Sequence, residues 1–189
     1  MFKKLFKKTF TNEDFFYELM TQVPREEWLQ EALQSNTIDI NYTDTNKNTF
    51  LMKALKKANY TAALWLIHNG ADPTIPNNDN KTVIDIAIEK NNIKIIEKLL
   101  NLQKLNINQK DNYGRSLLQN MIVSGNHKMA EIFIKCGADI NTLDNKGKHI
   151  LYDALSYGDP AFVRQLLTYE HIELNHLDQD GNTLMQHPK

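Results

Sequence analysis

The sequence predicts an all-α solenoid, in which short helix-turn-helix repeats stack side by side and are joined by β-hairpin-like loops. Three observations predict it: a polar loop position returns every 33 or 34 residues, each return begins a similar loop, and two amphipathic helical segments follow. The loop position is occupied by Asp44, Asn77, Asp111, Asp144 and Asp178. Because each helix is apolar on one face only, a single repeat cannot bury that face and neighbouring repeats must stack.

The loop of each repeat is predicted to be a tight turn that leads into a first helix. Three residues after the loop position stands Gly114, Gly147 or Gly181, where the turn favours positive φ. Lys47 and Asn80 replace that glycine in the first two loops. Two residues further on stand residues most of which carry an oxygen that can cap a helix: Thr49, Thr82, Ser116, His149 and Thr183.

A second helix is predicted after a break rich in glycine and asparagine. The breaks lie at Asn59, Asn91–Asn92, Gly125–Asn126 and Gly158–Asp159. The segments that follow are AALWLI, IKIIEKLL, MAEIFIK and AFVRQLL, whose apolar residues recur at helical spacing.

The two ends of the array depart from the pattern, as terminal caps do. Residues 10–43 are predicted to form a capping repeat of two helices, with Pro24 at the start of the second. The final segment, TLMQHPK, suits either an abbreviated cap or a chain that continues beyond Lys189. The expected organisation is therefore a basic tail over 1–9 and one domain over 10–189. Its parts are the capping repeat 10–43, repeats 44–76, 77–110, 111–143 and 144–177, and a partial repeat 178–189.

These repeats resemble the ankyrin repeat family over roughly residues 10–187. The family pattern runs Asp-x-x-Gly-x-Thr-Pro-Leu-His, then an apolar helix, a Leu-Leu helix and Gly-Ala-Asp. Gly70-Ala71-Asp72 and Gly137-Ala138-Asp139 match its end, and Leu99-Leu100 and Leu166-Leu167 match its second helix. The Thr-Pro-Leu-His part is degenerate, reading TFLM, TVID, SLLQ, HILY and TLMQ. The resemblance implies a non-enzymatic module that binds a partner protein.

Composition limits the other classes of function. With 22 basic and 23 acidic side chains, the chain lacks the positive charge of a dedicated nucleic-acid binder. A single cysteine suits a reducing compartment, and no apolar run resembles a signal peptide or a membrane span. We therefore expect a cytoplasmic monomer, although export as an effector stays open. The basic segment 2–8 predicts at most weak membrane contact.

Reactive residue types gather in CGADINTLDNKGKHILYDAL, residues 136–155, without forming a catalytic pattern. Cys136 is expected to end a second helix, where the helix dipole disfavours a thiolate, and His149 to cap the next helix. Asp139 and Asp144 are expected to organise turns. The acidic loops lack calcium-binding spacing, the histidines lack zinc-site spacing, and no glycine loop suits a phosphate. We expect no catalytic residue, metal or cofactor.

The resemblance places partner binding on the concave side, at the loop tips and on the exposed face of the first helices. Cations outnumber carboxylates there, and two tyrosines and two leucines add apolar surface. The predicted protein-binding residues are Lys81, Lys110, Tyr113, Arg115, Leu143, Lys146, Lys148, Tyr157 and Leu177.

We therefore predict recognition of a partner with an acidic or phosphorylated surface. Alternatives left open are an inhibitor or immunity-type protein, an effector that neutralises one target, a hydrolase using Cys136, and a peripheral membrane adaptor.

Overall fold

The computed structural model describes residues 10–102, 104–157 and 160–183 of the chain. The chain divides into two compact units, with the boundary between Lys104 and Leu105, and these are called unit 1 and unit 2. Within the described residues there are ten helices, and the only β-structure consists of isolated antiparallel bridges. The predicted all-α repeat architecture is confirmed.

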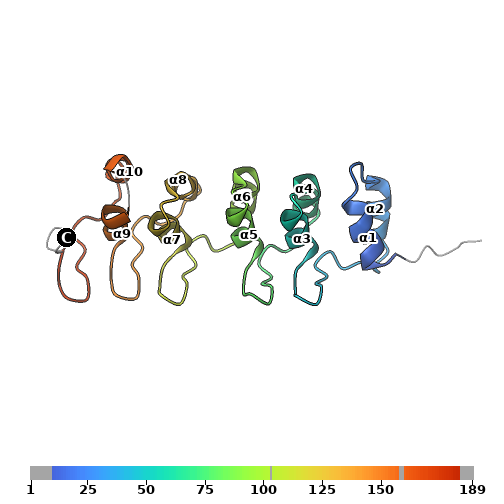
Figure 1. Ribbon diagram of the computed structural model, residues 1–189, viewed down its shortest axis with the longest axis horizontal. Coiled ribbons are helices and arrows are strands. Elements are labelled where there is room, and N and C mark those ends of the chain that lie inside the picture. Colours follow the sequence, from blue (N-terminus) through green and yellow to red (C-terminus); the bar gives the residue numbers. More distant parts are fainter. Residues whose placement is uncertain (1–9, 103, 158–159, 184–189) are drawn as a thin grey trace, which may run out of the picture. The chain divides into compact units, whose positions relative to one another are not determined.

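Unit 1 contains three helix pairs that lie side by side (Figure 1). The helices are α1 (Asn12–Leu19), α2 (Glu26–Gln34), α3 (Phe50–Lys56), α4 (Tyr60–His68), α5 (Val83–Glu89) and α6 (Ile93–Leu100). First helices pack on first helices and second on second, as α3 does on α5 and α4 on α6. One detail of the sequence analysis was wrong: α2 begins at Glu26, so Pro24 precedes the helix instead of starting it.

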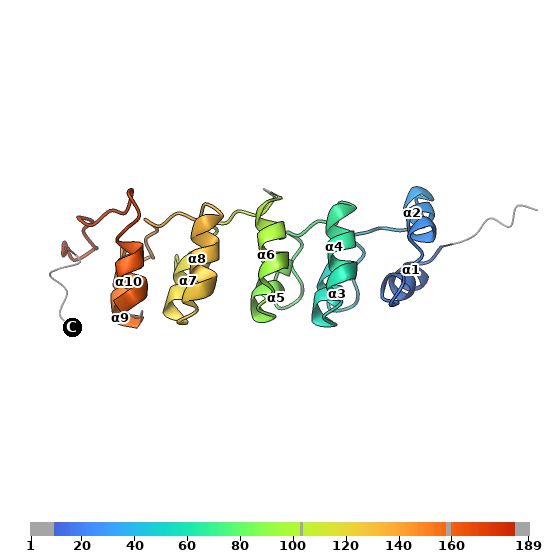
Figure 2. The ribbon, with the colours of Figure 1, turned by 90° about the horizontal axis from the view of Figure 1, so that it is seen from above.

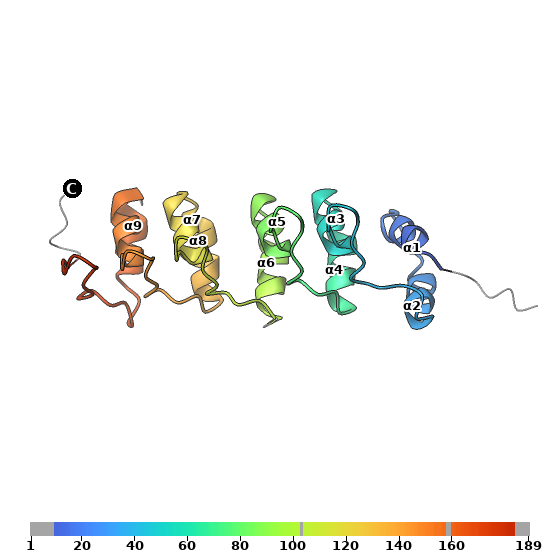
Figure 3. The same ribbon diagram turned by 90° about the horizontal axis from the view of Figure 1, so that it is seen from below.

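Unit 2 continues the same pattern with α7 (Leu117–Val123), α8 (His127–Lys135), α9 (Ile150–Tyr157) and α10 (Pro160–Leu166). Here α7 packs on both α8 and α9, and α9 packs on α10. Second helices form one layer in each unit, which faces the viewer in Figure 2. Figure 3 shows the opposite side, with the first helices and the loops that precede them.

Four of the loops are hairpins closed by backbone bridges. Antiparallel bridges pair Thr43 with Thr49, Lys110 with Ser116, Leu143 with His149, and Leu177 with Thr183. Inside each hairpin the predicted loop position organises the turn. The side chain of Asp144, for example, accepts hydrogen bonds from the backbone N–H of Lys146 (2.8 Å) and Lys148 (2.9 Å). The role predicted for the loop aspartates is confirmed.

Consecutive hairpins within a unit are joined by side-chain amides. The Asn78 amide donates to the carbonyl of Thr45 at 3.2 Å, and the Asn145 amide donates to that of Asn112 at 3.0 Å. Gln179 takes the equivalent place in the last hairpin and donates to the carbonyl of Asn145 at 2.8 Å. These bonds fix the register of neighbouring repeats within each unit.

Helix starts follow the predicted caps. The hydroxyls of Thr49 and Ser116 accept backbone hydrogen bonds of 3.2 Å from residues three positions later. Asparagines in the breaks cap the second helices in the same way: Asn59, Asn92 and Asn126. The core lies between the two helices of each pair and between stacked pairs, where Phe15, Phe50 and Phe133 are fully buried.

The basic tail 1–9, the predicted break Gly158–Asp159 and residues 184–189 of the final segment lie outside the described residues. The proposed partition of 10–189 into a single domain of repeats stays a prediction.

Candidate functional site

Five of the nine predicted binding residues surround one open hollow on unit 2, of about 360 Å³. We call it the unit 2 hollow. Its predicted members are Tyr113, Arg115, Lys146, Lys148 and Tyr157, and its other lining residues are Asn112, Asp144, Asn145, Tyr152, Asp153 and Ser156. Two consecutive hairpins form two of its walls, and α9 forms the third.

The hairpin walls are held by backbone hydrogen bonds. Asp111 accepts hydrogen bonds from the backbone N–H of Tyr113 (2.8 Å) and Arg115 (3.0 Å), as Asp144 does in the next hairpin. The N–H of Asn145 then donates to the carbonyl of Tyr113 at 3.0 Å. The side chains at the rim therefore project from turns that are already fixed before any ligand arrives.

Three cationic side chains line the hollow without a carboxylate partner. Within the described residues neither Arg115, Lys146 nor Lys148 forms an ion pair. The Nε of Arg115 is buried and has no hydrogen-bond partner there. The ammonium of Lys148 lies 6.0 Å from the ring centre of Tyr152, at the outer limit of a cation–π contact.

Both carboxylates of the hollow are already engaged. That of Asp144 is used in its turn, and that of Asp153 is 6% exposed and accepts a hydrogen bond of 2.8 Å from Gln119. Burial raises the pKa of the Asp153 carboxyl, against the hydrogen bond from Gln119 and the charge of Arg115. Neither carboxylate forms an ion pair with the rim cations in the described residues, although the charge of Arg115 acts on both Asp153 and Asp111.

Two tyrosines border the hollow at its open side. Tyr113 is 73% exposed and Tyr157 is 58% exposed. Tyrosine combines a large apolar ring with a hydroxyl, which is why it is enriched where proteins bind one another.

The other four predicted residues lie elsewhere. The ammonium of Lys110 donates to the carbonyl of Leu143 at 2.8 Å, so these two predicted residues bind each other between successive hairpins. Leu177 lies exposed at the base of the last hairpin. Lys81 belongs to unit 1.

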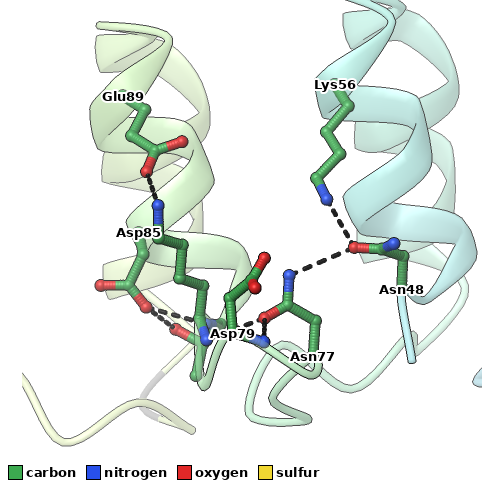
Figure 4. A network of polar contacts seen from close by, with 8 residues as sticks. Asn48, Lys56, Asn77, Asp79, Asp85 and Glu89 are labelled. Atoms are coloured by element: carbon green, nitrogen blue, oxygen red, sulfur yellow. Dashed lines mark hydrogen bonds and ion pairs between the residues drawn. The ribbon is translucent and has the colours of Figure 1, made fainter. Parts of the chain in front are cut away.

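The ammonium of Lys81 is paired with the carboxylate of Glu89, and this hydrogen bond raises the pKa of Lys81 (Figure 4). Around it the Asn77 side chain accepts from the backbone of Asp79 (3.0 Å) and Lys81 (2.9 Å). Its amide donates to Asn48 at 3.2 Å, which also accepts from Lys56 at 2.6 Å. Lys81 thus has a carboxylate partner, whereas Lys146 and Lys148 have none within the described residues.

The segment 136–155 has the structural roles predicted for it. Cys136 is the residue that follows α8, and its N–H completes the helix. The Nδ1 of His149 accepts the N–H of Leu151 at 3.2 Å, and its Nε2 faces Asn141 at 3.3 Å. His149 is 3% exposed, and burial lowers its pKa to about 4. Both ring nitrogens of His149 are therefore engaged next to the start of α9.

Neither a metal-binding cluster nor a membrane-spanning helix is present in the described part of the chain. Among residues 10–102, 104–157 and 160–183, no group of three His, Cys, Asp or Glu side chains could hold a metal ion. Over the same residues, no helix has the length and apolar character to cross a membrane.

Comparison with known families decides the class of the protein. A profile of three ankyrin repeats matches residues 84–179, about half of the chain, and a second ankyrin-repeat profile matches residues 33–87. The chain belongs to the ankyrin repeat family. Ankyrin repeats generally mediate protein–protein interaction and are typically non-enzymatic.

The chain spans a quarter or less of the length of each of three relatives that it matches. Protein glp-1 of Caenorhabditis elegans is 28% identical over 77% of the chain and 12% of its own length. An ankyrin repeat protein of Acanthamoeba polyphaga mimivirus is 27% identical over 81% of the chain and 25% of its own length. Alpha-latroinsectotoxin-Lt1a of Latrodectus tredecimguttatus is 30% identical over 47% of the chain and 6% of its own length.

Sequence reasoning missed Tyr152 and Asp153 as parts of the unit 2 hollow, and Gln119 beneath it. A signal was present, because Gln119 and Asp153 interrupt the apolar stripes of two first helices. A polar residue at such a position needs a buried partner. Their separation of 34 residues, close to one repeat, indicates that they could meet between neighbouring first helices.

Proposed function

We propose that this ankyrin repeat protein is a non-enzymatic interaction module whose unit 2 hollow binds an acidic or phosphorylated segment of a partner protein. The observation that carries the proposal is the imbalance of charge: Arg115, Lys146 and Lys148 have no ion-pair partner among the described residues, while Asp144 and Asp153 are engaged. An anionic ligand would neutralise cations that the fold leaves unpaired.

The tyrosines supply the apolar part of the binding energy in this proposal. Tyr113 and Tyr157 border the hollow, so a ligand seated there would cover rings that are now mostly in water. Because hydrogen bonds already fix both hairpins, few backbone torsions remain to be ordered on binding. The partner is recognised by a preformed surface.

The test is a comparison of capture by wild-type protein, the variant Tyr113→Ala/Arg115→Ala/Lys148→Ala and a charge-matched control. The control, Lys128→Ala/Lys135→Ala, removes two exposed cations from α8 in the same unit. Proteins from the native organism that bind each immobilised form would be quantified by mass spectrometry. Affinity for the captured partner would then be measured by titration calorimetry.

The wild type and the control are expected to capture the same acidic protein, which the triple variant binds at least tenfold more weakly. A milder variant, Tyr113→Ala/Lys148→Ala, leaves the half-buried Arg115 in place. It distinguishes a loss of partner binding from a loss of folded protein. Unchanged affinity in both hollow variants would contradict the proposal.

The inhibitor, immunity and effector alternatives share this mechanism and differ only in the protein that is bound. Identification of the captured partner distinguishes them.

A further inference from the structure

A second hollow, of about 450 Å³, lies on unit 1 between α1 and α3. We call it the unit 1 hollow and define it by Phe16, Tyr17, Met20, Tyr42, Lys53 and Lys57. None of these residues belongs to the predicted binding set or to the unit 2 hollow. Its volume falls within the range of about 300–1,000 Å³ that is typical of ligand pockets.

The hollow results from how α1 packs on the rest of unit 1. Phe15 is fully buried, with its ring centre 5.6 Å from that of Phe50 and 6.0 Å from that of Trp65. Because Phe15 points inward, Tyr17 is turned away from the core, and Phe16 is half-buried between the two. The ring of Phe16 stacks on Phe50 at 5.5 Å, with 11° between the planes, and forms the floor.

Two aromatic side chains at the edge of this floor are left in water. Tyr17 is 79% exposed, and Tyr42 is 41% exposed although its ring lies 5.7 Å from that of Phe50. The fold gains little from Tyr17 in this position. Exposed aromatic groups that adjoin one another mark interaction surfaces more often than isolated ones do.

The charge beside the aromatic floor restricts the ligand. The ammonium groups of Lys53 and Lys57 lie 4.2 Å and 5.6 Å from the ring centre of Phe16. Neither forms an ion pair within the described residues, and Glu13 is the only carboxylate among the lining residues. Two ammonium groups at one ring repel a cationic ligand and attract carboxylates.

We propose that the unit 1 hollow binds an acidic peptide segment of a partner protein, which inserts one aromatic or large aliphatic side chain between Phe16, Tyr17 and Tyr42. Carboxylates that flank this side chain lie beside Lys53 and Lys57. The site goes beyond the proposed function and does not rest on it, because its residues belong to a different unit and use an apolar anchor. The chain would then recognise two acidic segments at separate places.

The experiment is a selection from a random linear dodecapeptide library on immobilised full-length protein. Each enriched peptide would be synthesised and its affinity measured by fluorescence anisotropy for the wild type, Tyr17→Ala and Lys53→Glu/Lys57→Glu. The matched control is Lys94→Glu/Lys98→Glu, which makes the same charge change on the exposed face of α6 in the same unit. Lys57→Glu alone is the milder variant, because Lys57 is exposed while Lys53 is half-buried.

The enriched peptides are expected to share one aromatic or large aliphatic residue flanked by carboxylates. Their affinity should fall about tenfold or more in Tyr17→Ala and in Lys53→Glu/Lys57→Glu, and should stay unchanged in the control. Amide shifts in NMR spectra of the complex should centre on residues of α1 and α3.

Three results would overturn the proposal. One is a selection that yields no enriched peptide, or only basic ones. Another is binding that depends on Lys146 and Lys148 but not on Lys53 and Lys57, which would assign the peptides to the unit 2 hollow. The third is a concentration-dependent dimer in sedimentation that Tyr17→Ala dissociates, since a second copy of the chain would then be the occupant.

Discussion

The side-chain amide of Gln119 donates a hydrogen bond of 2.8 Å to the carboxylate of Asp153, which joins α7 to α9 within unit 2. Gln119 is fully buried and Asp153 is 6% exposed, so this polar pair lies inside an otherwise apolar contact between first helices. The Oε1 of Gln119 is buried without a partner in the described part of the chain. Stability at this contact therefore depends in part on a hydrogen bond to a mostly buried carboxylate at the edge of the unit 2 hollow.

Gln119→Leu is expected to lower the free energy of unfolding by about 2–3 kcal/mol at pH 7, because it leaves the Asp153 carboxylate buried without its donor. Burial raises the pKa of Asp153, so acidification protonates this group in the folded state. The loss relative to wild type should therefore shrink at pH 4. Urea titrations followed by circular dichroism at both pH values measure it. Gln119→Leu/Asp153→Leu is the control and should recover much of the loss; equal losses at the two pH values would contradict this account.

His149 makes the start of α9 sensitive to acid. Its neutral Nδ1 accepts the N–H of Leu151, and burial with the nearby His176 lowers its pKa to about 4 from an ordinary value of 6.5. Asp139 acts in the opposite direction. The unfolded chain binds the proton at His149 more readily than the folded chain does. The contribution of neutral His149 to the free energy of unfolding is therefore fully present above pH 6.5 and is lost as the pH falls toward 4. The expected loss is on the order of 2 kcal/mol.

The control for this acid sensitivity is His149→Thr, which restores the hydroxyl cap that Thr49 provides in the first repeat. Thermal unfolding between pH 7 and pH 4 should show a smaller decrease for this variant than for wild type. Parallel curves for the two proteins would assign the acid sensitivity to other groups.

The hairpin glycines are expected to differ in their tolerance of alanine. All have positive φ, but a Cβ at Gly114 would lie 2.6 Å from the backbone N of Asn145, while one at Gly181 would meet nothing within 4 Å. Gly181→Ala should cost about 1 kcal/mol from the backbone alone, and Gly114→Ala about 3 kcal/mol or more, because the next hairpin must move. Chemical denaturation of the two variants tests the order, and equal costs would contradict it.

Local interactions in these turns explain why much of the fold could be predicted from the sequence. Hairpin aspartates, helix caps and turn glycines act on backbone groups within four residues, so a recurring local pattern determines each repeat. Lys47 and Asn80 adopt positive φ of 56° and 58° in place of glycine, as the alignment of repeats predicts.

The binding set was harder to predict, because side-chain partners depend on what each residue meets in the folded repeat. Lys81 and Lys148 occupy the same hairpin position, yet Glu89 pairs with the first and no carboxylate pairs with the second in the described residues. Phe16 and Tyr17 lie in the capping repeat, which departs from the pattern, so repeat positions could not be carried over to them. The unit 1 hollow emerges only from the packing of α1 on α3.

The end of α1 and the start of α2 are held together by Glu18 and Arg25, which gives unit 1 its own acid sensitivity. The Glu18 carboxylate, mostly buried, accepts the backbone N–H of Arg25 at 2.8 Å and its Nε at 3.0 Å. These side-chain and backbone hydrogen bonds lower the pKa of Glu18 to about 2. A carboxyl whose pKa is lowered by folding stabilises the protein above the unfolded pKa, here 4.5, and loses that contribution as the pH falls toward 2.

Glu18→Gln should therefore lower the melting temperature of unit 1 by about 2–4 °C at pH 7, and flatten its pH dependence between 4.5 and 2. Because the Arg25 side chain is 68% exposed, 1 M salt should reduce the difference from wild type. Both tryptophans of the chain, Trp28 and Trp65, lie in unit 1, so their fluorescence reports this unit directly. Arg25→Lys keeps the positive charge and the backbone donor but loses the forked side-chain contact. Its melting temperature should therefore lie between those of the wild type and Glu18→Gln. A melting difference that is the same at pH 7 and at pH 2 would show that the carboxylate does not act through its charge.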